Sequence, residues 1–406
     1  MNLYFLMTFL FLSVAGLTAL DAALTSWTII PWVNGLRWLR VHFITLGALT
    51  ELLFGLLPLL AAKRASLPKP RTRLDIWLLL NAGLMLLLAG IPIVNKVLIF
   101  AGGTLIFSAT VLLMHQLYQL RPTNRTKPGL ARKFYLMGLA YFLVGILIGT
   151  GLWLGWSEVL GIQTPVEAHI HANNWGLMSL VFAGLLVDLY PKVAKRPFQW
   201  PNSINKIYWM MSLGALGLVL GPWFNKLYFT VPGLVLHLSA TIWLLLNVIK
   251  PLIGTGKLST PGILHLVTAY FWILAPVMMA PLVLLQIPGI PGPSIEQNAP
   301  QALIYGWALQ FGFAIIPLLL RRVFLPDSPA KLGGNWFSLI AVHLGGVLLW
   351  AGIFLNDSQT ALHGAAYGLW FLAMLPIAYE IWQIISTAMG GLQEQESLPT
   401  VAEAGD

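Results

Sequence analysis

The chain alternates between long apolar runs and short polar segments from its first residues to about position 388. Each run is about twenty residues long, the length that an α-helix needs to cross the hydrocarbon core of a bilayer. The pattern predicts an all-α integral membrane protein with about twelve transmembrane helices. The predicted helices cover residues 3–24, 37–61, 75–94, 96–119, 132–156, 167–190, 205–223, 228–250, 261–286, 300–322, 334–356 and 359–388.

Three of these runs share one spacing, in which a polar residue is followed five positions later by a glycine and thirteen positions later by a small residue. The triplets are His42, Gly47 and Gly55; His171, Gly176 and Gly184; and Gln301, Gly306 and Ala314. A period of about 130 residues corresponds to four helices and indicates an internal repeat. We therefore expect a single membrane domain (1–388) made of three pseudo-symmetric four-helix repeats, at about 1–120, 130–250 and 260–388.

The same period makes helices 2, 6 and 10 equivalent, and we expect them to be the inner helices of the three repeats. The glycines of these triplets lie about 140° from the polar residue, which predicts a role in helix packing behind it. Helix 5 is also rich in glycine, which favours close packing. After residue 388 the chain turns polar and acidic, so residues 389–406 are expected to form a disordered tail.

The composition supports a membrane protein and removes several kinds of chemistry. Of the 406 residues, 58% are hydrophobic and only 9% are charged, which is outside the range of soluble domains. The chain has no cysteine. Disulfides, iron–sulfur clusters, thiolate copper sites and covalently attached c-type haem are therefore excluded.

The net charge of +9 reflects membrane topology, because the basic residues are confined to alternate loops. Of the 23 Lys and Arg residues, 19 follow helices 2, 4, 6, 8 and 10, and four lie elsewhere: Arg37, Arg40, Lys96 and Lys226. The positive-inside rule then predicts that both termini are cytoplasmic. The external loops are expected at 157–166, 287–299 and 356–359, without regular structure at 287–299. This distribution gives no indication of a nucleic-acid partner.

Polar side chains gather at the start of helix 6, in residues 167–176 (EAHIHANNWG). His169 and His171 are two positions apart, roughly 200° around a regular helix, so both reach one centre only if the first turn is irregular. With the predicted topology, six of the eight histidines lie in the outer half or near the middle of the membrane. These are His42, His169, His171, His237, His343 and His363, whereas His115 and His265 lie toward the cytoplasm.

Two interpretations of the histidines remain open. Imidazole is the usual axial ligand of haem and also binds copper or iron, so the cluster can be a cofactor site. Alternatively, each histidine hydrogen-bonds across helices to an amide, a hydroxyl or a carbonyl. Glu51, near the middle of helix 2, has the same ambiguity, because it can relay protons or can be a protonated structural group. No hydrolase or nucleotide-binding motif is present.

The twelve spans, the cytoplasmic termini, the three repeats and the histidines near the outer ends of helices 2 and 6 together resemble the catalytic subunit (subunit I) of the haem-copper oxidases. That superfamily includes the cytochrome oxidases and the nitric oxide reductases. Residues 167–176 are also similar to oxidase-like membrane proteins, and the twelve-span NnrS-type haem and copper proteins of the nitric oxide response are of this general kind. The resemblance implies that His42 ligates haem and that His171, or His169, binds copper.

The chain departs from the oxidase pattern in two helices. Helix 7 has no histidine where the family has a pair, and helix 10 has Gln301 where the family has two haem ligands. The resemblance therefore implies a reduced centre and not a complete oxygen-reducing one. Its cofactor-binding ligands would come from His42, His343 and His363, and its metal ligands from His169, His171 and His237.

From these observations we expect an integral protein of the inner membrane of a prokaryote that binds haem, copper or iron in its outer half. Its role would be redox chemistry or a response to nitric oxide or oxygen, with an electron donor or a small gas as partner in addition to the lipid bilayer. An oxidoreductase-like activity fits this interpretation, although no catalytic residue is identified. The alternative is a cofactor-free transporter or assembly protein built on the same fold.

Overall fold

The computed structural model describes residues 2–31, 36–120 and 130–397, and these residues fold into helices with no β-strand among them. Eleven helices in this part of the chain are long and apolar enough to cross a membrane, and the apolar helix Leu74–Gly90 is only slightly shorter. The prediction of an all-α membrane protein with about twelve spans is confirmed. The basic loop at 121–129 and the end of the predicted tail at 398–406 lie outside the described residues.

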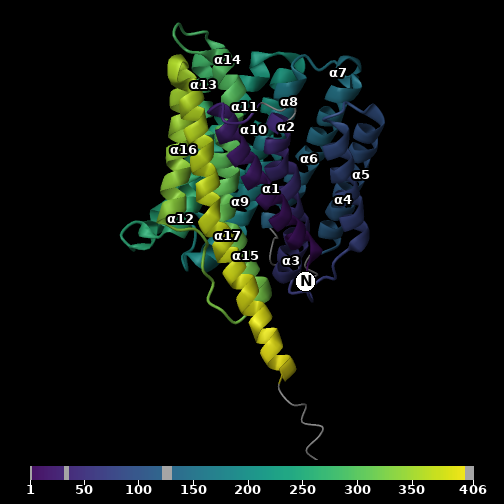
Figure 1. Cartoon of the computed structure of the whole chain (residues 1–406), viewed down its shortest axis with the longest axis vertical. Helices are drawn as coiled ribbons and strands as arrows, with labels where there is room; N and C mark the ends of the chain where they lie inside the picture. The colour runs from purple at the N-terminus through teal and green to yellow at the C-terminus, as the bar shows by residue number, and fades with distance from the viewer. Residues whose placement is uncertain (1, 32–35, 121–129, 398–406) are drawn as a thin grey trace, which may run out of the picture. The chain divides into compact units, whose positions relative to one another are not determined.

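The helices are labelled in Figure 1. In the first half of the chain they are α1 (Leu3–Ser26), α2 (Leu36–His42), η1 (Phe43–Leu49), α3 (Thr50–Arg64), α4 (Leu74–Gly90), α5 (Lys96–Gln119), α6 (Leu130–Leu154), α7 (Trp156–Val159), α8 (Pro165–His171), η2 (Ala172–Met178) and α9 (Ser179–Val193). In the second half they are η3 (Pro201–Ser203), α10 (Ile204–Phe224), α11 (Leu227–Ile249), η4 (Lys250–Leu252), η5 (Lys257–Ser259), α12 (Pro261–Thr268), α13 (Phe271–Leu284), α14 (Gly292–Ala302), η6 (Leu303–Leu309), α15 (Gln310–Phe324), α16 (Trp336–Phe354), η7 (Asn356–Ser358) and α17 (Gln359–Ser397).

The helices group into two compact units. Unit 1 comprises Met1–Thr18 and Trp32–Gly254, and therefore contains the first two predicted repeats apart from the end of α1. Unit 2 comprises Ala19–Pro31 and Thr255–Asp406, and contains the third repeat. The sequence predicted one domain over 1–388, whereas the helices pack most densely within these two units, which are described separately below.

Helices 2, 6 and 10 of the predicted order are the most buried spans. In an apolar 18-residue window of the spans Trp38–Arg64, Pro165–Val193 and Gly292–Phe324, 72%, 83% and 94% of the residues are buried, against 33–56% in the windows of the other eight long spans. In the outer spans, large apolar side chains such as Val97, Val235 and Met278 are exposed, as expected of residues that face lipid. The prediction that these three are inner helices is confirmed.

Each of the three inner helices contains one π-helical segment of seven residues. These segments, η1, η2 and η6, start at positions 43, 172 and 303, which are 129 and 131 residues apart. A π-helical turn is rare and adds one residue to the local backbone repeat. Its recurrence at the same place in three helices supports the internal repeat independently of the amino-acid pattern.

The glycine of each triplet packs against an aromatic ring of the preceding span. A Cβ atom on Gly47 would lie 2.7 Å from Phe11 Cδ1, and one on Gly176 would lie 2.4 Å from Tyr141 Cβ. In unit 2, a Cβ atom on Gly306 would lie 2.4 Å from the ring of Trp272. The aromatic residues, at 11, 141 and 272, follow the same period, so the glycines pack against neighbouring helices as predicted.

The last two spans of each repeat also pack through glycines, at positions 83, 214 and 345. Gly83 of α4 faces Gly102 of α5, and Gly214 of α10 faces Gly233 of α11, with the backbones in direct contact. Gly345 of α16 faces the carbonyl of Ala366 and the ring of Trp370 on α17. Figure 1 shows α4 beside α5 and α16 beside α17. These contacts recur every 131 residues, in agreement with three four-helix repeats.

The structure differs from the predicted helix limits in three places. The segment 287–299 was predicted to lack regular structure, but α14 begins at Gly292, with a proline in its first turn, where proline is well tolerated. The ninth predicted span is divided into α12 and α13 by a turn at 269–270. Helix α17 continues to Ser397, so the first residues of the predicted tail are helical.

Candidate functional site

The two histidines of the 167–176 motif lie on α8, which is regular up to His171. Because the π-helical segment η2 starts only after His171, the two side chains leave the helix in different directions. Nδ1 of His169 is 2.9 Å from the Gly145 carbonyl oxygen on α6. Nδ1 of His171 is 2.6 Å from the Leu218 carbonyl oxygen on α10. The two imidazoles of the motif therefore contact two different neighbouring helices, α6 and α10.

His42, at the end of α2, pairs with His169 in unit 1. The two ring centroids are 6.4 Å apart and the ring planes are inclined by only 21°. Nδ1 of His42 is 2.8 Å from the Trp38 carbonyl oxygen, one turn earlier. The Trp38 ring stacks on the His42 ring at a centroid distance of 4.0 Å, which holds the imidazole in place. Two of the predicted ligands are thus brought together from helices 2 and 6.

A second pair, His171 and His237, lies on the other side of α8. The two imidazoles are close enough for their charges to interact. The indole of Trp175 contacts both, at centroid distances of 6.4 Å from His171 and 5.3 Å from His237. Nε2 of His237 is 3.0 Å from the Ser179 hydroxyl. The six predicted histidines are therefore not one cluster, because even in unit 1 they form two pairs.

The remaining two predicted ligands belong to unit 2. Nε2 of His343 on α16 is 2.7 Å from the Thr268 hydroxyl and 3.0 Å from Nε2 of Gln310. His363 on α17 packs over Gly352, where a Cβ atom would lie 2.8 Å from the imidazole Cδ2. His343 is thus part of a polar group of side chains that joins α12, α15 and α16.

The hydrogen bonds distinguish histidines that are suited to bind a metal from those that are not. When Nδ1–H donates to a backbone carbonyl, Nε2 carries the lone pair, and this is the usual arrangement of a metal-bound histidine. His42, His169 and His171 have this arrangement. In His237 and His343, Nε2 already contacts a hydroxyl group, so their geometry fits the structural interpretation better.

His42 and His169 are two imidazoles from different helices, with ring centroids 6.4 Å apart and each Nδ1 on a backbone carbonyl. They are the two residues that would hold a haem or a metal ion here. The described residues contain no group of three or more His, Cys, Asp or Glu residues placed to hold a metal ion. A haem, which depends on few protein ligands, would be compatible with a pair of imidazoles.

Gln301 occupies the third-repeat position that corresponds to His42 and His171. It is 4% exposed, and its Oε1 accepts no hydrogen bond from the described part of the chain. The π-helical segment begins one residue after His42 and His171, but two residues after Gln301. The sequence predicted that the three positions are equivalent. In the structure, Gln301 lies one residue further from the π-helical segment than His42 and His171 do.

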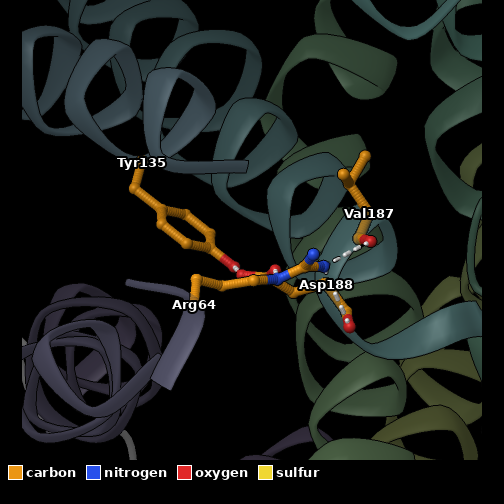
Figure 2. Close-up of polar contacts among 4 residues, drawn as sticks. All are labelled: Arg64, Tyr135, Val187 and Asp188. Carbon is orange, nitrogen blue, oxygen red and sulfur yellow. Dashed lines mark hydrogen bonds and ion pairs between the residues drawn. The ribbon is translucent and has the colours of Figure 1, made fainter. Parts of the chain in front are cut away.

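At the opposite end of helices 2 and 6, a buried ion pair joins three helices of unit 1. Figure 2 shows the Arg64 and Tyr135 side chains reaching Asp188 from α3 and α6. Nε of Arg64 donates to Oδ1 of Asp188 and Tyr135 donates to Oδ2 at 2.6 Å. Nη2 of Arg64 also donates to the Val187 carbonyl at 3.2 Å. Asp188 is 1% exposed, so its carboxylate depends on these partners.

Several of these polar residues were not found from the sequence. Arg64 was assigned only to a basic loop, and Thr268 and Gln310 were not considered. In unit 2, Arg321 pairs in a similar way with Glu380 at 2.5 Å, and the Gly334 amide donates to the same carboxylate at 3.2 Å. The available signal was the presence of Asp188 and Glu380 within otherwise apolar spans, which predicts a partner for each but does not identify it.

The chain matches no model of a known protein family and no curated protein sequence. The resemblance to haem-copper oxidases therefore depends on the architecture and on the 167–176 motif alone.

Proposed function

We propose that this protein binds a haem, or a copper or iron ion, between His42 and His169, in the outer half of the membrane of a prokaryotic cell. The observation that supports it most is the near-parallel pair of imidazoles at 6.4 Å, each with Nδ1 on a backbone carbonyl. The two ligands come from equivalent inner helices, which the π-helical segments and glycine contacts hold in place.

A haem or copper ion in this position would supply one-electron redox chemistry and affinity for nitric oxide or oxygen. The residues of the chain orient the ligands. The Trp38 and Gly145 carbonyls fix the two tautomers, and Trp38 covers one face of His42. Gly149 gives His169 room, because a Cβ atom there would lie 2.6 Å from the ring. This proposal does not use His343 and His363, which belong to unit 2.

The first test is an absorption spectrum and a metal analysis of protein purified from cells supplied with haem and copper. We expect a Soret band that shifts on reduction, or one equivalent of metal. His42→Ala and His169→Ala should each remove most of the signal, because one of only two protein ligands is lost. His171→Ala should retain it, since His171 faces α10.

His115→Ala is the matched control, because His115 is exposed on α5 and its Nε2 lies 2.8 Å from Nε2 of Gln119 on the same helix. It should leave the spectrum and the metal content unchanged. A colourless, metal-free wild-type protein would contradict the proposal and favour a cofactor-free transporter or assembly protein. A coloured His42→Ala variant would place the ligand elsewhere.

The assignment to the outer half can be tested separately by topology. The distribution of basic residues predicts that reporters active only outside the cytoplasm give signal when inserted at 157–166, 287–291 or 356–359. The same reporters should be silent at the C-terminus. The opposite pattern would move the His42–His169 pair to the cytoplasmic side of the membrane.

A further inference from the structure

Unit 1 contains two buried carboxyl groups with different surroundings. Asp188 is paired with Arg64 and receives a hydrogen bond from Tyr135. Glu51, near the middle of the span Trp38–Arg64, has an exposed fraction of 0%, and neither of its carboxyl oxygens has a hydrogen-bond partner among the described residues. An ionised carboxylate in such a place is strongly unfavourable. The contrast indicates that the two groups carry different charges.

The polar neighbour of Glu51 is Asn81 on α4. The Asn81 amide nitrogen donates to the Trp77 carbonyl at 3.0 Å, and the Asn81 Oδ1 atom, which is also buried, accepts no hydrogen bond. A proton on the Glu51 carboxyl group would provide a donor for Asn81 Oδ1, which has none among the described residues.

Tyr4 on α1 packs against α3 about one turn from Glu51. Its ring centroid is 6.4 Å from that of Phe54, and a Cβ atom on Gly55 would lie 2.7 Å from Tyr4 Cβ. The Tyr4 hydroxyl donates to the Arg73 carbonyl oxygen at 3.3 Å. Arg73 in turn pairs with Asp75, and both of these side chains are exposed. Arg73 and Asp75 are the charged groups next to Tyr4.

We propose that Glu51 is an internal proton-binding site, held as the neutral acid against Asn81, that exchanges its proton with the Arg73–Asp75 surface through Tyr4. The chemistry is the transfer of one proton to and from a carboxylate oxygen, with water at the surface as donor and acceptor. The site gives the protein a way to take up a proton inside the membrane. It requires no bound haem or metal, so it can fail or succeed independently of the His42–His169 site.

Infrared spectroscopy of the full-length protein tests the protonation state directly. A neutral carboxylic acid has a C=O stretching band separate from the amide bands, and we expect such a band at neutral pH. Glu51→Gln should remove it, and Asn81→Leu should shift it to higher frequency because the acceptor of the O–H is lost. Asp188→Asn is the matched control and should leave the band unchanged. A band that survives in Glu51→Gln, or no acid band in the wild type, would overturn the proposal.

The exchange route is tested by the rate at which this band shifts after transfer into deuterium oxide. Tyr4→Phe should slow the shift about tenfold or more, because it removes a hydroxyl that can pass the proton. Tyr228→Phe, at an exposed position of α11, is the control and should exchange at the wild-type rate. An unchanged rate in Tyr4→Phe would refute the route through Tyr4.

Discussion

Replacing Arg64 with alanine is expected to lower the free energy of unfolding by about 3 kcal/mol, the lower end of the cost of breaking a buried ion pair. The reason is that Asp188 is 1% exposed and would lose its ion-pair partner while keeping the hydrogen bond from Tyr135. The lower end applies because the Arg64 side chain is itself 46% exposed, so water already screens part of the interaction. Denaturation of the purified protein in mixed micelles, followed by tryptophan fluorescence, measures the loss.

The matched control is the ion pair of Arg73 and Asp75, whose side chains are 40% and 53% exposed. Arg73→Ala should cost less than about 1 kcal/mol, as is usual for exposed pairs. The double variant Arg64→Met with Asp188→Leu should recover much of the lost stability, because no buried charge is left behind. If Arg64→Ala and Arg73→Ala lower the free energy of unfolding equally, the buried Arg64–Asp188 pair contributes no more to stability than the exposed pair.

The spans could be predicted from the sequence because few backbone structures of an apolar segment are stable in a bilayer. Every backbone polar group in lipid must be satisfied within the segment, so a long apolar run becomes a helix. The predicted limits 3–24 and 167–190 agree within three residues with the helical spans Leu3–Ser26 and Pro165–Val193. The limit that failed at 287–299 lies where prolines make helix and loop compatible with the same residues. The turn at 269–270 falls within the apolar run 261–286 and had no such signal.

The repeat could be predicted because its glycines are fixed by contacts and not by composition. Gly47, Gly176 and Gly306 each lie under an aromatic ring that a Cβ atom would displace. The same residues therefore recur at the same spacing wherever the contact recurs. The π-helical segments that accompany them have no such signature, because an added backbone residue changes hydrogen bonds and does not require a particular side chain.

The candidate site was only partly predictable. The sequence identified the histidines, and the angle of roughly 200° between His169 and His171 already placed them on different faces. It could not show that His42 lies near His169, since these residues are 127 positions apart in the chain. It also could not reveal which ring nitrogen each histidine uses, because that depends on carbonyl groups of other helices. The pairing of Arg64 with Asp188 was hidden for the same reason.

The glycine contacts between the last two spans of the first and second repeats are expected to be sensitive positions, because the nearby atoms include backbone atoms. A Cβ atom on Gly214 would lie 2.7 Å from the backbone nitrogen of His237 and 2.9 Å from the Gly233 carbonyl oxygen. Backbone atoms of α11 cannot turn aside as a side chain can, so α10 and α11 must separate. Gly214→Ala should therefore cost about 3 kcal/mol, the upper part of the range for overpacking, despite the better helix propensity of alanine.

The same contact occurs in all three repeats, so the three glycine-to-alanine variants can be compared. The loss of stability should be larger where the new Cβ atom meets backbone atoms than where it meets a side chain. Gly83→Ala should be as harmful as Gly214→Ala, since its Cβ atom would lie 2.9 Å from the Gly102 carbonyl oxygen and 3.1 Å from the Ile106 nitrogen. Gly345→Ala should cost less, because the closest atom belongs to the Trp370 side chain.

Gly312→Ala, with its nearest neighbour at 3.4 Å, is the control and should stabilise the protein by up to about 1 kcal/mol. Thermal unfolding in detergent gives the order of the four variants, and a Gly214→Ala variant as stable as Gly312→Ala would contradict the close helix packing.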